Sequence, residues 1–151
     1  MAELLVVFDC VVFLQSLISE VGPAARSLEL FEHGKFSSAV SREVLSEIRE
    51  VLSRSELRKR YPVLIDERVD RLIDVLVYRG QLFRQIRRHY EYQRDPYDEA
   101  YLNLAIEAHA DFLVTRDNDM LDLMKWEREE GRAFQKRFRR LKIVDLSVFL
   151  R

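Results

Sequence analysis

Cysteine, glycine and proline are scarce in this chain, and the scarcity of the first two excludes particular kinds of site and structure. The 151 residues include one cysteine, four glycines and three prolines. The single cysteine, Cys10, cannot form an internal disulfide, and its apolar neighbours suggest a buried thiol. The four glycines are isolated from one another, which excludes a glycine-rich phosphate-binding loop. Nothing in the cysteine content therefore points to an oxidising compartment.

Long hydrophobic runs are also missing. The segment 1–17 is rich in apolar residues, but it has no basic region before them and Asp9 interrupts it. No stretch approaches the roughly 18 to 20 apolar residues that span a membrane. We therefore expect neither secretion nor membrane insertion, and a cytoplasmic protein.

Apolar and charged residues are both plentiful. Hydrophobic residues make up 48% of the chain and charged residues 34%, with a formal net charge of −1. This composition is sufficient for a full core and predicts one soluble globular domain over residues 1–151. A net charge near zero does not exclude nucleic-acid binding, because local patches rather than totals make that contact.

Apolar runs and helical periodicities alternate along the sequence. Strands are predicted at 4–8, 36–40, 82–86, 111–114 and 141–144, and helices at 11–18, 24–33, 41–53, 66–78, 97–109 and 147–150. This alternation predicts an α/β fold with a mostly parallel sheet and helices on both faces. The stretch 126–140 is unusually charged for a connection between strands, and we interpret it as a helical insertion or an exposed arm.

Two acidic residues directly follow predicted strands. Asp9 ends the first strand, and Asp117 comes shortly after the strand 111–114. Ligands of open parallel sheets bind beyond the carboxyl ends of the strands, so both are candidate site residues. Either acid could instead only cap the following helix or turn.

Two further acids lie on predicted helices. At about 100° per residue, Glu47 falls at the margin of its helix's apolar stripe, so it reaches inward or stays a solvated boundary residue. Asp95 is a candidate N-cap followed by Pro96, and Asp98 then stands where a capping box places its acid. Asp98 also lies on the side of Leu102, toward the sheet, where an ionised carboxylate needs a compensating cation or hydrogen-bond donors.

Four carboxylates in one cleft predict a hard divalent cation. They would repel one another unless Mg²⁺ or Mn²⁺ neutralised them. The three histidines, His33, His89 and His109, are scattered without zinc-ligand spacing, and His109 is interpreted as a core residue. The candidate metal ligands and catalytic residues are Asp9, Glu47, Asp98 and Asp117.

Basic and aromatic residues accompany these acids. One set precedes Asp95 and comprises Arg84, Arg87, Arg88, His89, Tyr90, Tyr92 and Arg94, and a second comprises Arg128, Arg132, Lys136, Arg137, Arg139 and Arg140. Cations and stacking rings are what single-stranded RNA requires, although each set could equally be a solvated face. We single out Arg87, Arg88, Arg94 and Arg116 as candidate RNA contacts.

The order of these motifs resembles the PIN-domain family, and more narrowly its VapC-like members, over nearly the whole chain. The resemblance rests on the strand ending in Asp9, the segment 41–48, Asp95-Pro96-Tyr97-Asp98 and the segment 113–117. It implies a three-layer αβα sandwich with a twisted, mostly parallel sheet. It also implies a Mg²⁺- or Mn²⁺-dependent endoribonuclease that uses Asp9, Glu47, Asp98 and Asp117, with Asp95 and Asp119 as nearby acids.

The resemblance further implies partners and leaves one alternative open. Expected partners are an RNA substrate, a cognate antitoxin protein and a second copy of the chain, because apolar helix faces at 57–64 look underused. Cys10-Val11 stands where the family often has a polar pair after the first acid, which removes hydrogen bonds that orient metal ligands. The alternative is a catalytically weakened module that binds RNA or a protein. A receiver-like signalling domain would need an acidic pair at the first strand, which Cys10 does not provide.

Overall fold

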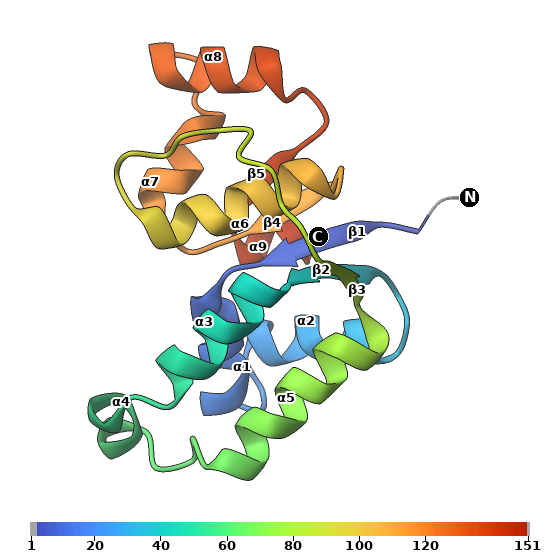
Figure 1. Ribbon diagram of the computed structural model, residues 1–151, viewed down its shortest axis with the longest axis vertical. Helices are drawn as coiled ribbons and strands as arrows, with labels where there is room; N and C mark the ends of the chain where they lie inside the picture. The colour runs from blue at the N-terminus through green and yellow to red at the C-terminus, as the bar shows by residue number, and fades with distance from the viewer. Residues whose placement is uncertain (1–2, 151) are drawn as a thin grey trace.

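The computed structural model describes residues 3–150, and its centre is a sheet of five parallel strands (Figure 1). The strands are β1 (Leu5–Phe8), β2 (Ser37–Ser41), β3 (Gln81–Phe83), β4 (Phe112–Val114) and β5 (Lys142–Val144), in the order β3-β2-β1-β4-β5. β1 lies in the middle, where Val6 pairs with Ser38 on one side and Phe112 on the other. Val6 and Val7 are fully buried, as expected for a strand covered on both faces.

Helices cover both faces of the sheet. They are α1 (Cys10–Ile18), α2 (Pro23–Glu32), α3 (Arg42–Leu52), α4 (Ser55–Arg60), α5 (Asp66–Arg79), α6 (Pro96–Glu107), α7 (Asn118–Leu121), the 3-10 turn η1 (Asp122–Met124), α8 (Glu129–Arg137) and α9 (Leu146–Phe149). Figure 1 shows α1, α2, α3 and α5 on one side of the sheet and α6, α7 and α8 on the other. The predicted αβα sandwich is confirmed.

The strand order places a switch point between β1 and β4. The chain passes from β1 outward to β2 and β3, then returns across the sheet to β4 and β5. Right-handed connections therefore put the helices after β1 and those after β4 on opposite faces. A crevice opens between two such strands at their carboxyl ends, which is the usual ligand site of this architecture.

Local caps fix the starts of the helices at this edge. Asp9 accepts a hydrogen bond from the backbone N–H of Val12, and Ser41 accepts one from Val44, both at 3.1 Å. Asp95 caps α6, and Pro96 occupies the first helical position. These caps agree with the sequence interpretation, because they depend on neighbours within three residues.

Several details differ from the sequence-based prediction. α4 and α7 were not expected. His109 is exposed rather than part of the core, because α6 ends at Glu107 and His109 then adopts a positive φ of 53°. Leu64, within the segment thought to be underused, is 1% exposed. The stretch 126–140 is not a free arm, since α8 buries Phe134.

Among residues 3–150, no helix has the length and apolar character needed to cross a membrane.

Candidate active site

Asp9 is held at the centre of the carboxyl edge by residues that directly follow β4. It is 4% exposed, and its second oxygen accepts a hydrogen bond from the hydroxyl of Thr115. The same hydroxyl accepts a hydrogen bond from the backbone N–H of Asp117, 3.0 Å away. Burial raises the pKa of Asp9, while the bonds from Thr115 and Val12 oppose that rise. Asp9 is therefore both a helix cap and a buried acid whose position is fixed from two elements.

Asp98 and Asp117 face each other across this edge. Burial, a hydrogen bond with Asp117 and the charges of Asp95, Asp117 and Asp9 raise the pKa of Asp98 to about 8. One carboxyl oxygen of Asp98 is buried and has no hydrogen-bond partner in the described part of the chain. The expected capping contact is not formed there; Asp95 instead accepts from Tyr97 N–H at 2.9 Å. Asp117 itself caps α7 through Asp119 N–H at 2.8 Å.

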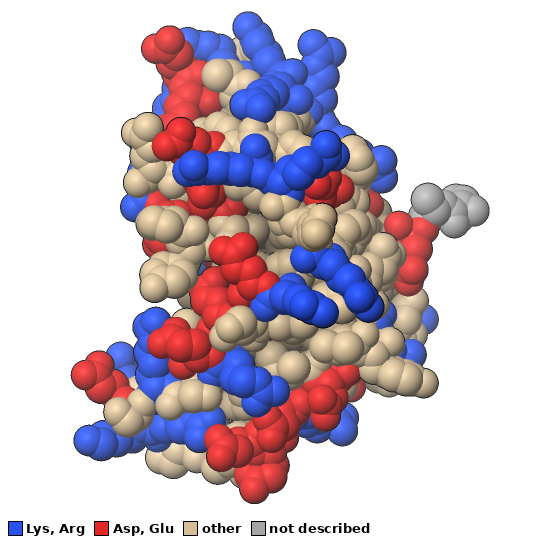
Figure 2. All heavy atoms as spheres, in the orientation of Figure 1, with Lys and Arg blue, Asp and Glu red and all other residues tan. Residues whose placement is uncertain are grey.

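Glu47 approaches the same group from α3. Its side chain is half-buried, which agrees with the inward placement predicted from helical spacing. Burial and the charges of Asp95, Glu43, Asp9 and Glu50 raise the pKa of Glu47 to about 7. The mutual effects of these acids show that Asp9, Glu47 and Asp98 share one electrostatic environment. In Figure 2, acidic side chains gather beside a hollow on the left of the molecule.

The chemistry of these carboxylates suits a divalent cation, but their side chains are not arranged as a complete metal site. Among residues 3–150, no three His, Cys, Asp or Glu side chains are arranged as a ready metal-binding group. The donors are all carboxylate oxygens, which hard cations prefer. One oxygen of Asp98 is buried without a partner in the described residues, and burial together with the neighbouring carboxylates raises its pKa; a cation would offset both effects.

Cys10 occupies the position next to Asp9 that carries the departure from the family pattern. Burial, Glu47 and Asp9 raise the pKa of its thiol to about 12, so the sulfur is neutral near pH 7. The hydroxyl of Tyr101 lies beside this thiol and interacts with it. A thiolate is the form that binds metals and attacks substrates, so the raised pKa of Cys10 does not favour either role for it.

Most of the arginines proposed to contact RNA already pair with acids. Arg87 lies 3.2 Å from Glu107, and Arg88 lies 2.9 Å from Glu99. Arg94 bridges Asp119 and Glu130, at 3.2 and 3.3 Å. Arg116 instead donates to the side-chain oxygen of Gln15, at 2.8 Å, and follows Thr115 at the site edge. Of the four, Arg116 is the best placed to meet an anion beside the carboxylates.

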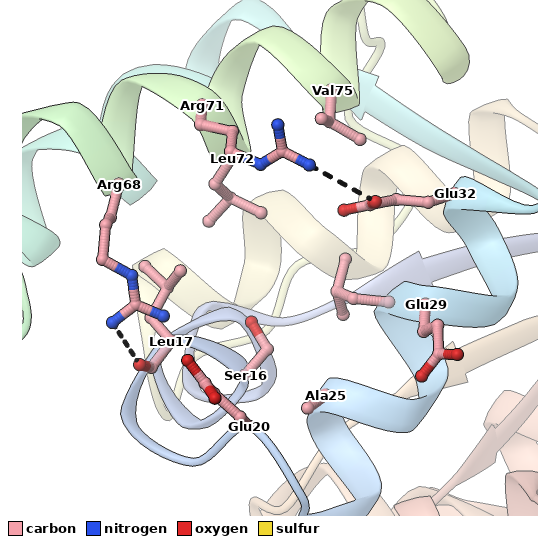
Figure 3. A pocket seen from close by; sticks show the side chains of 11 residues that line it. Ser16, Leu17, Glu20, Ala25, Glu29, Glu32, Arg68, Arg71, Leu72 and Val75 are labelled. Carbon is pink, nitrogen blue, oxygen red and sulfur yellow. Dashed lines mark hydrogen bonds and ion pairs between the residues drawn. The ribbon is translucent and has the colours of Figure 1, made fainter.

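A separate groove, on the same side of the sheet as α3 (Figure 1), contains none of the candidate site residues. It lies between α1, α2 and α5, with Leu17, Leu72 and Val75 among its lining side chains (Figure 3). Arg68 donates to the Leu17 carbonyl at 2.8 Å, and Arg71 lies 3.8 Å from Glu32. The acidic group is thus confined to the carboxyl edge of the sheet.

Comparison with known proteins agrees with the fold. A family model described as a PIN domain matches residues 5–119. The chain belongs to the PIN-domain family. The match runs from β1 into α7 and therefore includes all four candidate carboxylates, whereas α8, β5 and α9 lie outside it.

One solved structure extends the likeness of this PIN domain to nearly its full length. It is a chain of the crystal structure of VapBC2 from Rickettsia felis bound to a DNA fragment from their promoter. The TM-score is 0.56 at 16% identity, covering 94% of this chain and 98% of that chain. At this identity the match establishes the shared fold. No curated protein matches significantly.

Thr115 is the site residue whose role the sequence analysis did not assign. It was visible only as a polar residue directly after the buried strand 111–114. Its partner, Asp9, is 106 positions away, so no local pattern predicts the contact.

Proposed function

We propose that this PIN-domain chain is a metal-dependent endoribonuclease that hydrolyses RNA phosphodiester bonds. The observation that carries the proposal is the convergence of Asp9, Glu47, Asp98 and Asp117 at the carboxyl edge of the sheet. Burial and neighbouring carboxylates raise the pKa values of Asp9, Glu47 and Asp98, which supports a site suited to Mg²⁺ or Mn²⁺. PIN domains are in general nucleases, which agrees with this chemistry.

Each carboxylate has a distinct part in the proposal. A bound dication supplies Lewis-acid activation of water and stabilises charge on the scissile phosphate and the leaving oxygen. Asp9, fixed by Thr115, and Asp98, with its unpartnered oxygen, are the proposed direct ligands. Glu47, with a pKa of about 7, can hold or accept a proton near neutral pH. Asp117 orients Asp98 through their shared hydrogen bond.

The biological setting we propose is that of a cytoplasmic toxin paired with an antitoxin. The fold similarity to a chain of a VapBC2 complex supports this setting, since that structure contains both components. A cognate antitoxin and a second copy of the chain are accordingly the proposed protein partners. RNA is the proposed substrate, with Arg116 as the contact nearest the carboxylates.

A second candidate function is an RNA- or protein-binding PIN module with weakened catalysis. Two observations favour it. No three acids within the described residues form a ready metal group, and Cys10 replaces a polar neighbour of Asp9 with a neutral thiol. In this alternative the acids would bind a cation weakly, and RNA would be held without being cut.

The test is cleavage of an end-labelled single-stranded RNA with Mg²⁺, Mn²⁺ or a chelator. Asp9→Asn should lower cleavage by more than about 100-fold, because changes around metal ligands alone already cost about 10- to 100-fold. Asparagine also caps helices, so the variant should fold. The matched control is Asp74→Asn, an exposed acid on α5, which should leave cleavage unchanged.

Two results would contradict the nuclease proposal. One is cleavage by Asp9→Asn at the level of the parent protein, and the other is full cleavage in excess chelator. RNA binding without cleavage under every metal condition would favour the binding module instead.

A further inference from the structure

A basic hollow lies at the far end of α6 from the carboxylates. It has a volume of about 370 Å³ and lies between the end of α6, the loop after β3 and the segment from α8 to β5. Its basic side chains are Arg87, His89, His109, Arg137, Arg139 and Arg140. Asp98 and Glu107 are nine residues apart on α6, about 14 Å along the helix axis. In Figure 1 this end of α6 lies on the right, away from the acidic edge.

Two guanidinium groups of the hollow are not neutralised. Glu107 is engaged by Arg87 and by His89, whose ring nitrogen lies 3.3 Å away. Arg140 pairs with Asp111 at 3.2 Å. Within residues 3–150, neither Arg137 nor Arg139 has a carboxylate partner. The hollow therefore carries an excess of positive charge that suits an anion.

The contacts of these two arginines leave donors available. Arg137 lies over the ring of Phe138, with 4.9 Å from the guanidinium carbon to the ring centre. Arg139 donates to the carbonyl of Lys136, at 3.4 Å. Both side chains belong to exposed residues. Arginine binds phosphate through paired N–H groups, and its planar group also stacks on rings.

Apart from Glu107, the remaining walls of the hollow are apolar. They comprise Ala105, Ile106, Ala110, Phe138 and Leu141. The volume falls within the roughly 300 to 1,000 Å³ typical of small-molecule pockets. Apolar walls beside a charged platform favour a ligand with a planar apolar body and a phosphate, since a sugar phosphate alone would leave these walls uncovered. Nucleotides are the class with this chemistry.

His109 adds an imidazole to the hollow at a conformational cost. The backbone N–H of Ala110 donates to the carbonyl of Ala105 at 2.9 Å, closing α6 through a residue with φ of 53°. Glycine is usual at such a helix end, because other residues are strained in the left-handed region. The side chain that stands there instead lines the hollow and can donate to a phosphate oxygen.

We propose that this hollow binds a nucleotide, with Arg137 and Arg139 on the phosphate and the apolar walls against the base. The ligand is a free nucleotide or the end of an RNA strand, which share this chemistry. The site lies outside the carboxylate group and does not depend on cleavage. It therefore extends beyond the proposed nuclease function.

Calorimetric titration with adenosine 5′-monophosphate in excess chelator tests the proposal. We expect saturable binding of one nucleotide, and a loss of at least tenfold in affinity in Arg137→Gln/Arg139→Gln. The matched control is Lys136→Gln/Arg26→Gln, which removes the same charge from exposed residues outside the hollow. Asp9→Asn should bind as the parent does, which separates this site from the carboxylates.

Comparison ligands then test phosphate recognition and identify the source. Adenosine should bind at least tenfold more weakly than the monophosphate. If a 5′-phosphorylated RNA tetranucleotide competes with the monophosphate, the natural ligand of the hollow is an RNA end. If it does not compete, the ligand is a free nucleotide. Equal affinity for adenosine, or unchanged monophosphate binding by Arg137→Gln/Arg139→Gln, would overturn the proposal. Neither result would bear on metal-dependent cleavage, because the chelator prevents it throughout.

Discussion

The hydroxyl of Thr115 joins two of the candidate acids and leads to a prediction for a single residue. It donates to Asp9 and accepts from the backbone N–H of Asp117. Thr115→Val keeps the shape but removes this partner from the buried Asp9 carboxylate and from the part-buried Asp117 N–H, so we expect a loss of about 1 to 3 kcal/mol in the free energy of unfolding. Urea denaturation in chelator at pH 8 measures it.

The control for this prediction is Thr115→Ser, which retains the hydroxyl and loses only a methyl group. It should be more stable than Thr115→Val. If the valine variant were as stable as the parent, the link between β1 and β4 through Thr115 would contribute little.

Residue positions were predictable where the cause is local. Asp9, Ser41 and Asp95 cap helices that begin next to them, and Glu47 follows from the periodicity of its own helix. Asp98 was only half predicted, because a contact with Asp117 from another element replaces the capping bond. Residues paired with distant partners, such as Thr115, require the folded chain.

At the scale of elements, the docking of α8 depends on a glycine. A Cβ at Gly131 would lie 2.2 Å from the carbonyl oxygen of Lys125, where no atom can stay. Helix propensity alone would make Gly131→Ala stabilising by about 1 kcal/mol. We expect the opposite, a loss of about 1 to 3 kcal/mol from overpacking, measured by thermal or urea unfolding.

An exposed position on the same helix provides the comparison. Lys136→Ala should change stability by less than about 0.5 kcal/mol, as surface substitutions usually do. A Gly131→Ala protein more stable than the parent would mean that α8 is not held against the turn at 122–125.

The elements that sequence analysis missed or misjudged are short or held by distant contacts. α4 and α7 have six and four residues, too few to show a periodicity. The charged stretch 126–140 resembled an arm because most of its residues are solvated. Its attachment rests on Phe134, whose ring lies 5.0 Å from that of Tyr90, a residue of the loop before α6.

For the whole molecule, the alternation of strands and helices was sufficient to predict a parallel sheet with its acids at one edge. The strand order was not predictable from this pattern, because right-handed connections permit several orders for five strands. The order decides that β1 and β4 are neighbours and so brings Asp9 beside Thr115 and Asp117. It also places the ends of α6 and α8 together around the basic hollow, which no motif indicated.

The shared electrostatic environment of the acids predicts an unusual pH dependence of stability. Asp98 and Glu47 have pKa values of about 8 and about 7 in the folded protein, above their ordinary values, and the pKa of Asp9 is raised as well. Between about pH 4 and 8 the folded state therefore holds protons that the unfolded state releases. Stability linked to these groups is fully present below their ordinary pKa values and falls as pH rises to 8.

A divalent cation should reverse this loss, because it replaces the protons as the partner of the carboxylates. Thermal unfolding at pH 5 and pH 8, with Mn²⁺ or with chelator, measures both effects. We expect Mn²⁺ to raise the melting temperature at pH 8 and to have little effect at pH 5.

Asp98→Asn removes one of the buried charges, so its stability in chelator should decline less between pH 5 and 8. Carboxylates with lowered pKa values, Glu99, Glu107 and Asp122, titrate alike in both proteins and cancel in the comparison. The opposite result would be a parent protein whose stability rises toward pH 8 relative to that of Asp98→Asn. It would show that these acids do not destabilise the fold when they ionise, and that no cation is needed to neutralise them.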